Sequence, residues 1–234
     1  MFVGCFRVFI ATAVFLYGVA AFPARSEEAG SYSGSVTLAS QYVARGRSYT
    51  LGDPAIQASL TYTHNSGAYV GFWGSSANAA EKVYMELDLS AGYIGKVSDY
   101  ITYDVGVTRF VFPSAPDSYG YDYTEFSAAT WIDLGSFTPV FAVFYSPNSF
   151  GASDDSVYMR GGVRVPVIEN VTLFGNAGLQ MVEGAKHDVI DWNLGVLIKA
   201  FDLDFDFRYT DTNSEHRLGR IAKERFVASV TKTF

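Results

Sequence analysis

Ionisable side chains recur at every second position in several stretches of this chain. Within residues 203–210, Asp204, Asp206 and Arg208 alternate with leucine, phenylalanine and tyrosine. Successive side chains of an extended chain point to opposite faces, so this stretch predicts a β-strand with one charged and one apolar face. A row of charges along a water-filled space selects dissolved solutes by their charge. The apolar face must meet either a second sheet, as in a soluble sandwich, or lipid, as in a membrane barrel.

Other stretches with the same alternation supply further candidates for such an interior surface. The candidate pore-lining residues are Glu86, Asp88, Asp104, Glu125, Arg160, Arg164, Asp191, Lys199, Asp204, Asp206 and Arg208. Acidic residues between 83 and 134 are expected on one wall. Arg160 and Arg164 are expected on the opposite wall, as a basic ladder that faces carboxylates and favours small polar or anionic solutes. The alternative interpretation is that these charges pair with one another and plug a narrow barrel.

Three further arginines are candidates for the mouth of a pore. Arg45 and Arg47 fall in a polar stretch between the first two predicted strands, and Arg109 lies near the outer end of a later strand. Three interpretations stay open for these side chains. They fold inward and constrict the mouth, they bind anionic lipid headgroups, or they remain solvated loop charges.

The residues that other chemistries require are badly spaced or missing from the sequence. His64, His187 and His216 fall in separate connections, and no pair of histidines has metal-ligand spacing. The chain has no Gly-x-Ser-x-Gly elbow, and the acidic loop residues match no calcium loop. A lipase embedded in a barrel would need a serine and a histidine together at the outer rim, where Ser156 and His187 are the nearest pair. We therefore expect no enzyme, no metal site and no cofactor.

The first 26 residues are expected to be a secretory signal peptide, and residues 27–234 a single barrel domain. Arg7 precedes an apolar core of about fourteen residues, which small residues separate from two glutamates at 27–28. Cleavage is expected after Ala21, Ala24 or Ser26, with Ser26 favoured, and an uncleaved anchor is the alternative.

The composition of the remaining chain fits an exported protein that does not bind nucleic acid. The single cysteine, Cys5, lies within the predicted signal, so the mature chain needs no reducing compartment. Of 17 basic residues, removing Arg7 and Arg25 leaves 15 against 24 acidic ones, a net charge of −9. Nucleic-acid binding is not expected, because no basic stripe is present.

Period-two alternation predicts twelve strands, and the lengths of their connections indicate how they are arranged. Long and short connections follow one another along the whole chain, as in outer-membrane barrels with long extracellular loops and short periplasmic turns. The registers across two short turns agree with this arrangement, because they pair Ala200 with Leu203 and Leu134 with Phe137 on matching faces. The predicted strands are residues 34–43, 55–63, 68–75, 83–95, one starting at 101, 123–134, 137–145, 157–165, 171–181, 190–199, 203–210 and 225–234.

Aromatic residues and the C-terminus add two features of membrane barrels. The chain ends on Phe234, and Phe226 and Val230 share its parity, which resembles the signal that barrel-assembly machinery recognises. Lys232 interrupts the apolar parity. Aromatic residues near strand ends are candidates for girdles at the membrane interfaces. They are Tyr42, Tyr69, Tyr93, Tyr100, Trp131, Tyr145, Trp192 and Tyr209.

Several short motifs resemble the TorF-type porin family, proteobacterial proteins that were formerly a family of unknown function. The resemblance is specific from about residue 33 to residue 145 and loose thereafter. It implies an outer-membrane barrel with porin-like transport. The motifs are residues 40–46 (SQYVARG), 54–57 (PAIQ), 66–75 (SGAYVGFWGS), 85–89 (MELDL), 91–93 (AGY), 103–107 (YDVGV), 109–113 (RFVFP) and 123–125 (YTE).

We conclude that the sequence predicts an all-β protein, a transmembrane antiparallel up-and-down barrel of twelve strands in the outer membrane of a Gram-negative bacterium. Its expected function is passive diffusion of small polar or charged solutes. Its expected partners are the lipid bilayer, the barrel-assembly machinery and those solutes. The alternative is a non-conducting barrel with a structural or surface-interaction role through its long loops. A secreted soluble β-sandwich is the third interpretation.

Overall fold

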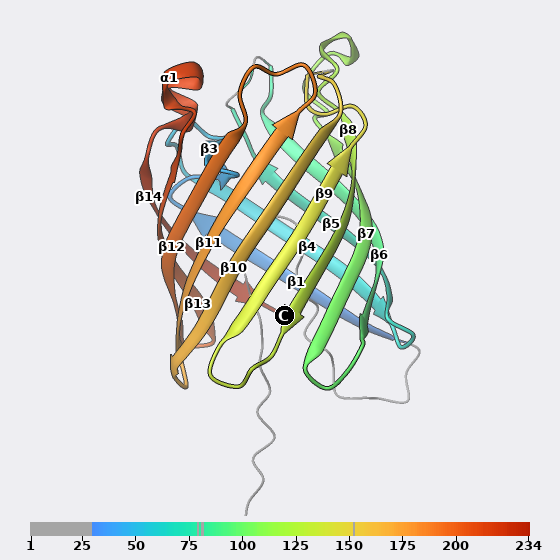
Figure 1. Ribbon diagram of the computed structural model, residues 1–234, viewed down its shortest axis with the longest axis vertical. Helices are drawn as coiled ribbons and strands as arrows, with labels where there is room; N and C mark the ends of the chain where they lie inside the picture. Colours follow the sequence, from blue (N-terminus) through green and yellow to red (C-terminus); the bar gives the residue numbers. More distant parts are fainter. Residues whose placement is uncertain (1–29, 79, 81, 152) are drawn as a thin grey trace, which may run out of the picture.

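The computed structural model describes residues 30–78, 80, 82–151 and 153–234. In this part of the chain, twelve antiparallel strands close into one barrel (Figure 1), which confirms the predicted fold. The predicted signal peptide lies outside the described residues. The barrel strands are β1 (Gly30–Ala39), β4 (Ala55–His64), β5 (Ala68–Ser76), β6 (Met85–Lys96), β7 (Ile101–Val111), β8 (Tyr123–Ile132), β9 (Thr138–Ser146), β10 (Ser156–Ile168), β11 (Val171–Val182), β12 (Val189–Ala200), β13 (Leu203–Thr212) and β14 (Arg225–Thr233).

The barrel closes by pairing β1 with both β4 and β14. The first strand begins and ends four residues earlier than predicted. It was expected at residues 34–43, and β1 occupies Gly30–Ala39. The serine-rich start of β1 is polar on the face that pairs with the threonines of β4, with Ser31 opposite Thr63. In the sequence such a stretch resembles a polar segment that precedes the first strand. In the structure its backbone N–H and C=O groups form hydrogen bonds within the sheet.

The turns at one end of the barrel set the predicted registers. The turn Phe201–Asp202 has positive φ at both residues, 55° and 60°, as a two-residue hairpin turn requires. It places Ala200 opposite Leu203 and Lys199 opposite Asp204, as predicted. β10 runs longer than predicted, because Pro166, expected in a turn, lies within the strand beside a register shift between Pro166 and Ile168.

Long connections gather at the other end of the barrel (Figure 1). We name them L1 to L6, and in outer-membrane barrels this end is extracellular. L1 carries the short strands β2 (Val43–Ala44) and β3 (Arg47–Ser48), L3 carries η1 (Asp117–Tyr119), and L6 carries α1 (Glu215–Leu218) and η2 (Gly219–Ala222). Within the described residues, no helix has the length and apolar character to cross a membrane. The described residues of L1 to L6 are 40–54, 77–78 with 80 and 82–84, 112–122, 147–151 with 153–155, 183–188 and 213–224.

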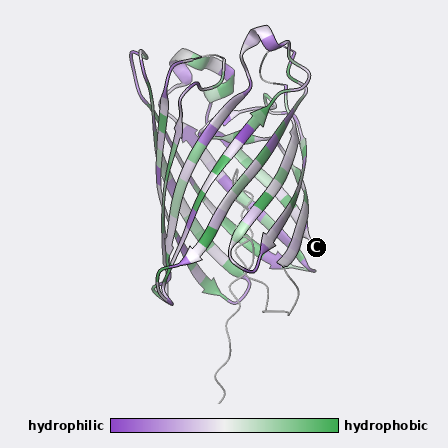
Figure 2. Ribbon diagram, turned by 90° about the vertical axis from the view of Figure 1, so that its right-hand side faces the viewer, coloured by the Kyte–Doolittle hydropathy of each residue, from purple (hydrophilic) through white to green (hydrophobic). Residues whose placement is uncertain are grey.

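The outer surface of the barrel is apolar and the inner surface is polar. Leu60 on β4, Val70 on β5 and Leu194 on β12 are 54%, 57% and 59% exposed although they are large and apolar. Figure 2 shows hydrophobic and hydrophilic residues alternating along the strands. A belt of exposed leucine, valine and phenylalanine is stable against hydrocarbon and not against water. The soluble sandwich is therefore wrong, and the belt places the chain in the outer membrane.

Three of the predicted girdle aromatics face the interior instead. Tyr69 and Trp131 lie on the inward parity of β5 and β8, and Tyr42 lies in L1 and is buried. Tyr69 donates a hydrogen bond to Asp104 at 3.1 Å. A Cβ on Gly92 would lie 2.5 Å from the Tyr69 hydroxyl, so a glycine makes room for the ring. The outward set, exposed at the strands or turns, is Tyr93, Tyr100, Tyr145, Trp192 and Tyr209.

The two faces of β4 make a direct test of this orientation. Leu60→Arg places a guanidinium in the apolar belt near the middle of the strand, where it should cost about 2–4 kcal/mol. Thr61→Arg places the same group on the inward face and should cost much less. Unfolding in lipid vesicles, followed by heat-modifiable gel migration, measures both. Equal destabilisation by the two variants would contradict the assignment of the faces.

Candidate functional site

L1 folds into the barrel as a small hairpin. β2 pairs with β3 through Val43 opposite Ser48 and Ala44 opposite Arg47. The turn between them, Arg45–Gly46, has positive φ at both residues, 48° and 68°. A Cβ on Gly46 would lie 2.7 Å from Thr212 Cβ and 2.9 Å from Asp191 Cβ. The tip of L1 therefore presses against the wall formed by β12 and β13, and a larger residue than glycine does not fit there.

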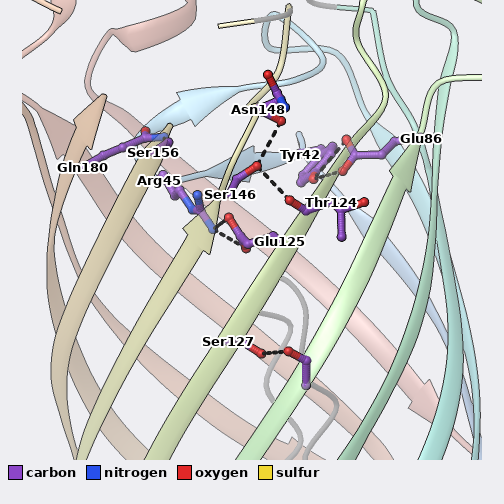
Figure 3. A network of polar contacts seen from close by, with 11 residues as sticks. Tyr42, Arg45, Glu86, Thr124, Glu125, Ser127, Ser146, Asn148, Ser156 and Gln180 are labelled. Atoms are coloured by element: carbon purple, nitrogen blue, oxygen red, sulfur yellow. Dashed lines mark hydrogen bonds and ion pairs between the residues drawn. The ribbon is translucent and has the colours of Figure 1, made fainter. Parts of the chain in front are cut away.

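The Arg45 side chain reaches the wall opposite its own loop. One guanidinium nitrogen donates to both carboxylate oxygens of Glu125 on β8, at 2.8 Å each. The guanidinium carbon lies 4.3 Å from the ring centre of Tyr158 on β10 and 5.2 Å from that of Phe144 on β9. Figure 3 shows this side chain pointing into the barrel toward Glu125. Burial by itself lowers the pKa of Arg45, but the Glu125 carboxylate outweighs it and raises that pKa above its ordinary value.

The base of L1 is fixed by tyrosines. The Tyr42 hydroxyl donates to the carboxylate of Glu86 on β6 at 3.3 Å (Figure 3), and its ring stacks on Tyr49 with centres 4.7 Å apart. Burial, and then Glu86, raises the pKa of Tyr42, so its hydroxyl remains a donor at neutral pH. Burial, and then Glu86, likewise raises the pKa of Tyr49 to about 12. Arg225 on β14 donates to the side chain of Gln41 at 3.0 Å.

Four carboxylates surround this hairpin near the extracellular ends of their strands. Glu86 and Asp88 lie within the first four residues of β6, Glu125 is third in β8, and Asp191 is third in β12. Each is at most 4% exposed. Both carboxylate oxygens of Asp88, and Oδ2 of Asp191, have no hydrogen-bond partner among the described residues. The extracellular half of the interior thus holds more buried acceptors than L1 satisfies.

The remaining predicted interior charges lie deeper in the barrel. The Arg208 guanidinium donates to both carboxylate oxygens of Asp206 at 2.7 and 2.6 Å. Near the periplasmic end, Lys199 lies 3.6 Å from Asp204, and these side chains are 38% and 14% exposed. The alternation of the strands places all eleven predicted pore-lining residues on the inward face, and several of them are paired as the plugging interpretation expects.

One expectation about position is wrong, and one of the three interpretations left open for Arg109 does not hold. β10, which carries Arg160 and Arg164, is separated from β8 by β9 alone, so the basic pair and the acidic strands are not on opposite walls. Arg160 instead shares a row with Asp191, on either side of Gly178. Arg109 lies on the outward parity of β7, 3.8 Å from Asp122 with both side chains exposed, so it does not constrict the mouth.

Sequence analysis missed the wall residues that receive Arg45. Tyr158 and Phe144 lie on strands that were predicted correctly, but alternation alone does not show which interior residues meet across a barrel. The one local signal was the Arg45–Gly46 pair inside a polar loop, because such a pair resembles a tight hairpin turn. No group of three or more histidine, cysteine or acidic residues that could hold a metal occurs in the described part of the chain.

These features define the class of the protein: an outer-membrane β-barrel with a loop folded into its lumen. The chain belongs to a bacterial family of unknown function, Gcw_chp, whose model matches residues 24–234. No curated protein matches it in sequence.

Three solved structures with similar folds are porins or outer-membrane channels. The KdgM porin, solved in complex with disordered oligogalacturonate, is 9% identical with a TM-score of 0.59, over 86% of this chain and 99% of that one. The NanC porin is 11% identical with a TM-score of 0.59, over 86% and 98%. An outer-membrane channel from Pseudomonas putida F1 is 12% identical with a TM-score of 0.54, over 89% and 97%.

The Arg45–Glu125 ion pair predicts how firmly L1 is held. Glu125→Gln leaves the buried guanidinium without a countercharge, and breaking such a pair from one side costs about 3–5 kcal/mol. We expect trypsin to cleave after Arg45 or Arg47 at least about tenfold faster than in the wild type. Asp122→Asn, which breaks the exposed pair with Arg109, is the matched control and should change nothing. Unchanged cleavage of the Glu125→Gln variant would show that other contacts hold L1.

Proposed function

We propose that the chain is a porin-like channel through which small polar or charged solutes diffuse passively across the outer membrane. The observation that carries this proposal is the set of inward-facing charges below L1, which includes Arg160 on β10, Asp206 on β13 and the partly exposed Lys199 on β12. If the barrel served only as an anchor, apolar side chains would fill its interior at a lower free-energy cost, because burying charged groups is unfavourable. The lumen therefore suits water and solutes.

L1 is the constriction of this channel. It crosses the extracellular half and reaches the far wall through Arg45, whose partner Glu125 belongs to a barrel strand. The resemblance to TorF-type porins between residues 33 and 145 includes L1 and supports this assignment. The structure of the KdgM porin with oligogalacturonate supports the view that a barrel of this fold admits a charged solute.

The C-terminal strand supports an interaction during assembly. Phe226 and Val230 lie on the outward parity of β14, and Phe234 directly follows the last residue of that strand; Phe226 and Phe234 are 61% and 73% exposed. We propose that these residues form the signal by which barrel-assembly machinery recognises the chain.

A second candidate function has one observation in its favour. Because L1 is buried and ion-paired inside the lumen, the resting barrel is narrowed at its extracellular half. A non-conducting barrel that acts through its long loops would also show this arrangement. Conductance in planar bilayers separates the two functions.

The first prediction of the channel proposal concerns L1. Replacing residues 43–48 by two glycines removes the hairpin and should raise single-channel conductance and liposome swelling several-fold. Shortening L5 at residues 184–187, which are exposed, is the matched control and should leave both unchanged. If folded wild-type and hairpin-deleted barrels both fail to conduct, the channel proposal is wrong and the non-conducting role is favoured.

The second prediction concerns the basic ladder. Arg160→Gln combined with Arg164→Gln removes two inward charges from β10 and should lower the anion-to-cation permeability ratio measured from reversal potentials. Arg109→Gln removes one positive charge from the outer surface and should not change that ratio. Unchanged selectivity of the double variant would count against a role for the ladder in permeation.

A further inference from the structure

The atoms that receive Arg45 all belong to three adjacent strands of the wall. Glu125 of β8 supplies the carboxylate, and Phe144 of β9 and Tyr158 of β10 supply two ring faces. These three side chains, which we call the cage, are at most 4% exposed. Arg45, in contrast, comes from a loop. The cage is therefore part of the barrel wall, whereas the side chain that occupies it belongs to loop L1.

The cage is also held by contacts within the barrel wall. The Tyr158 hydroxyl donates to Asp191 Oδ1 at 3.3 Å, and its ring lies 5.7 Å from that of Phe144. A Cβ on Gly178 would lie only 2.1 Å from the Tyr158 hydroxyl oxygen, so this glycine makes the space in which Tyr158 lies flat against the wall. Withdrawal of L1 would leave these contacts intact and the Glu125 carboxylate uncompensated.

Some buried acceptors near the cage are not satisfied by Arg45. Asp88 is 2% exposed, lies close enough to Glu86 and Glu125 to be affected by their charges, and both its carboxylate oxygens lack a partner among the described residues. Asp191 Oδ2, beside Tyr158, likewise has no hydrogen-bond partner among the described residues. Buried acceptors without donors are costly, and a cation with several N–H groups satisfies them.

The geometry selects among cations. A planar guanidinium presents two N–H donors to a carboxylate and its flat face to aromatic rings, whereas a compact ammonium does so less well. We infer that Glu125, Phe144 and Tyr158 form a binding site for guanidinium-bearing organic cations, which Arg45 occupies in this structure as a tethered ligand. The binding site stands on the geometry alone. The further statement that such cations are solutes of the channel rests on the proposed function.

Chemical rescue tests the site. Arg45→Ala empties the cage, and ethylguanidinium is the probe. In the detergent-solubilised full chain, saturating ethylguanidinium should raise the melting temperature of Arg45→Ala by about 2–4 °C, because a ligand that binds only the folded state stabilises it. The wild type should not respond, because its own arginine fills the site. Neutral ethylurea, of similar shape, should have no effect on either protein.

Matched variants make the result specific. Arg47→Ala removes the other arginine of the hairpin, leaves Arg45 in the cage and should respond like the wild type. Arg45→Ala combined with Glu125→Gln should lose the response. Arg45→Gln, whose amide can bond to Glu125 without supplying charge, is the second variant if Arg45→Ala does not fold. An equal response to ethylurea, or a full response without Glu125, would overturn the inference.

Bilayer recordings distinguish this inference from the channel proposal. If Arg45→Ala conducts and ethylguanidinium blocks the current, both are supported. A melting shift without any conductance supports the site and contradicts the channel. Conductance without a melting shift supports the channel and contradicts the site.

Discussion

A chain that crosses hydrocarbon must satisfy every backbone N–H and C=O within itself, and a closed sheet is one of only two ways to do so. In this protein closure depends on β1, which pairs with β4 on one side and β14 on the other. The strand alternation then leaves each residue one of two environments, lipid or lumen. Every charged side chain on the inward parity is thereby placed in a narrow space where its partners must come from the opposite wall, from a neighbour, from water or from a loop.

At the extracellular end, L1 is the loop that supplies partners for inward-facing charges. Its hairpin carries arginine at the tip and tyrosine at the base, so it brings a charge to Glu125 and a hydroxyl to Glu86. The two anchors lie on different strands of the acidic side, while Gly46 lies against β12 and β13. Because L1 is held at three parts of the barrel circumference, it resists bending toward any one of them, although each contact involves only a few residues.

The strands and registers were predictable from sequence because lipid on one side and charge on the other enforce a strict period of two. The pairing of Lys199 with Asp204 and the outward position of Leu194 follow from that rule alone. The rule fails for L1, since polar residues suit water outside the barrel as well as the lumen inside it. It also assigned Tyr42 to a strand face, when the chain had already turned inward after Ala39. The contact of Arg45 with Tyr158 joins residues more than a hundred positions apart and has no local signal.

The energetics of the Arg45–Glu125 pair follow from the burial of both charges. Burying two ions costs nearly as much as their attraction returns, so the net contribution of such a pair is small even though removing either partner alone is expensive. Withdrawal of L1 exposes the Arg45 guanidinium to water, which repays its desolvation, but leaves Glu125 among other buried carboxylates. The open state is then stabilised only if another cation takes the place of Arg45. If solutes pass L1 as proposed, an arginine at its tip couples the position of the loop to the charge of the solute, whereas a neutral tip would not.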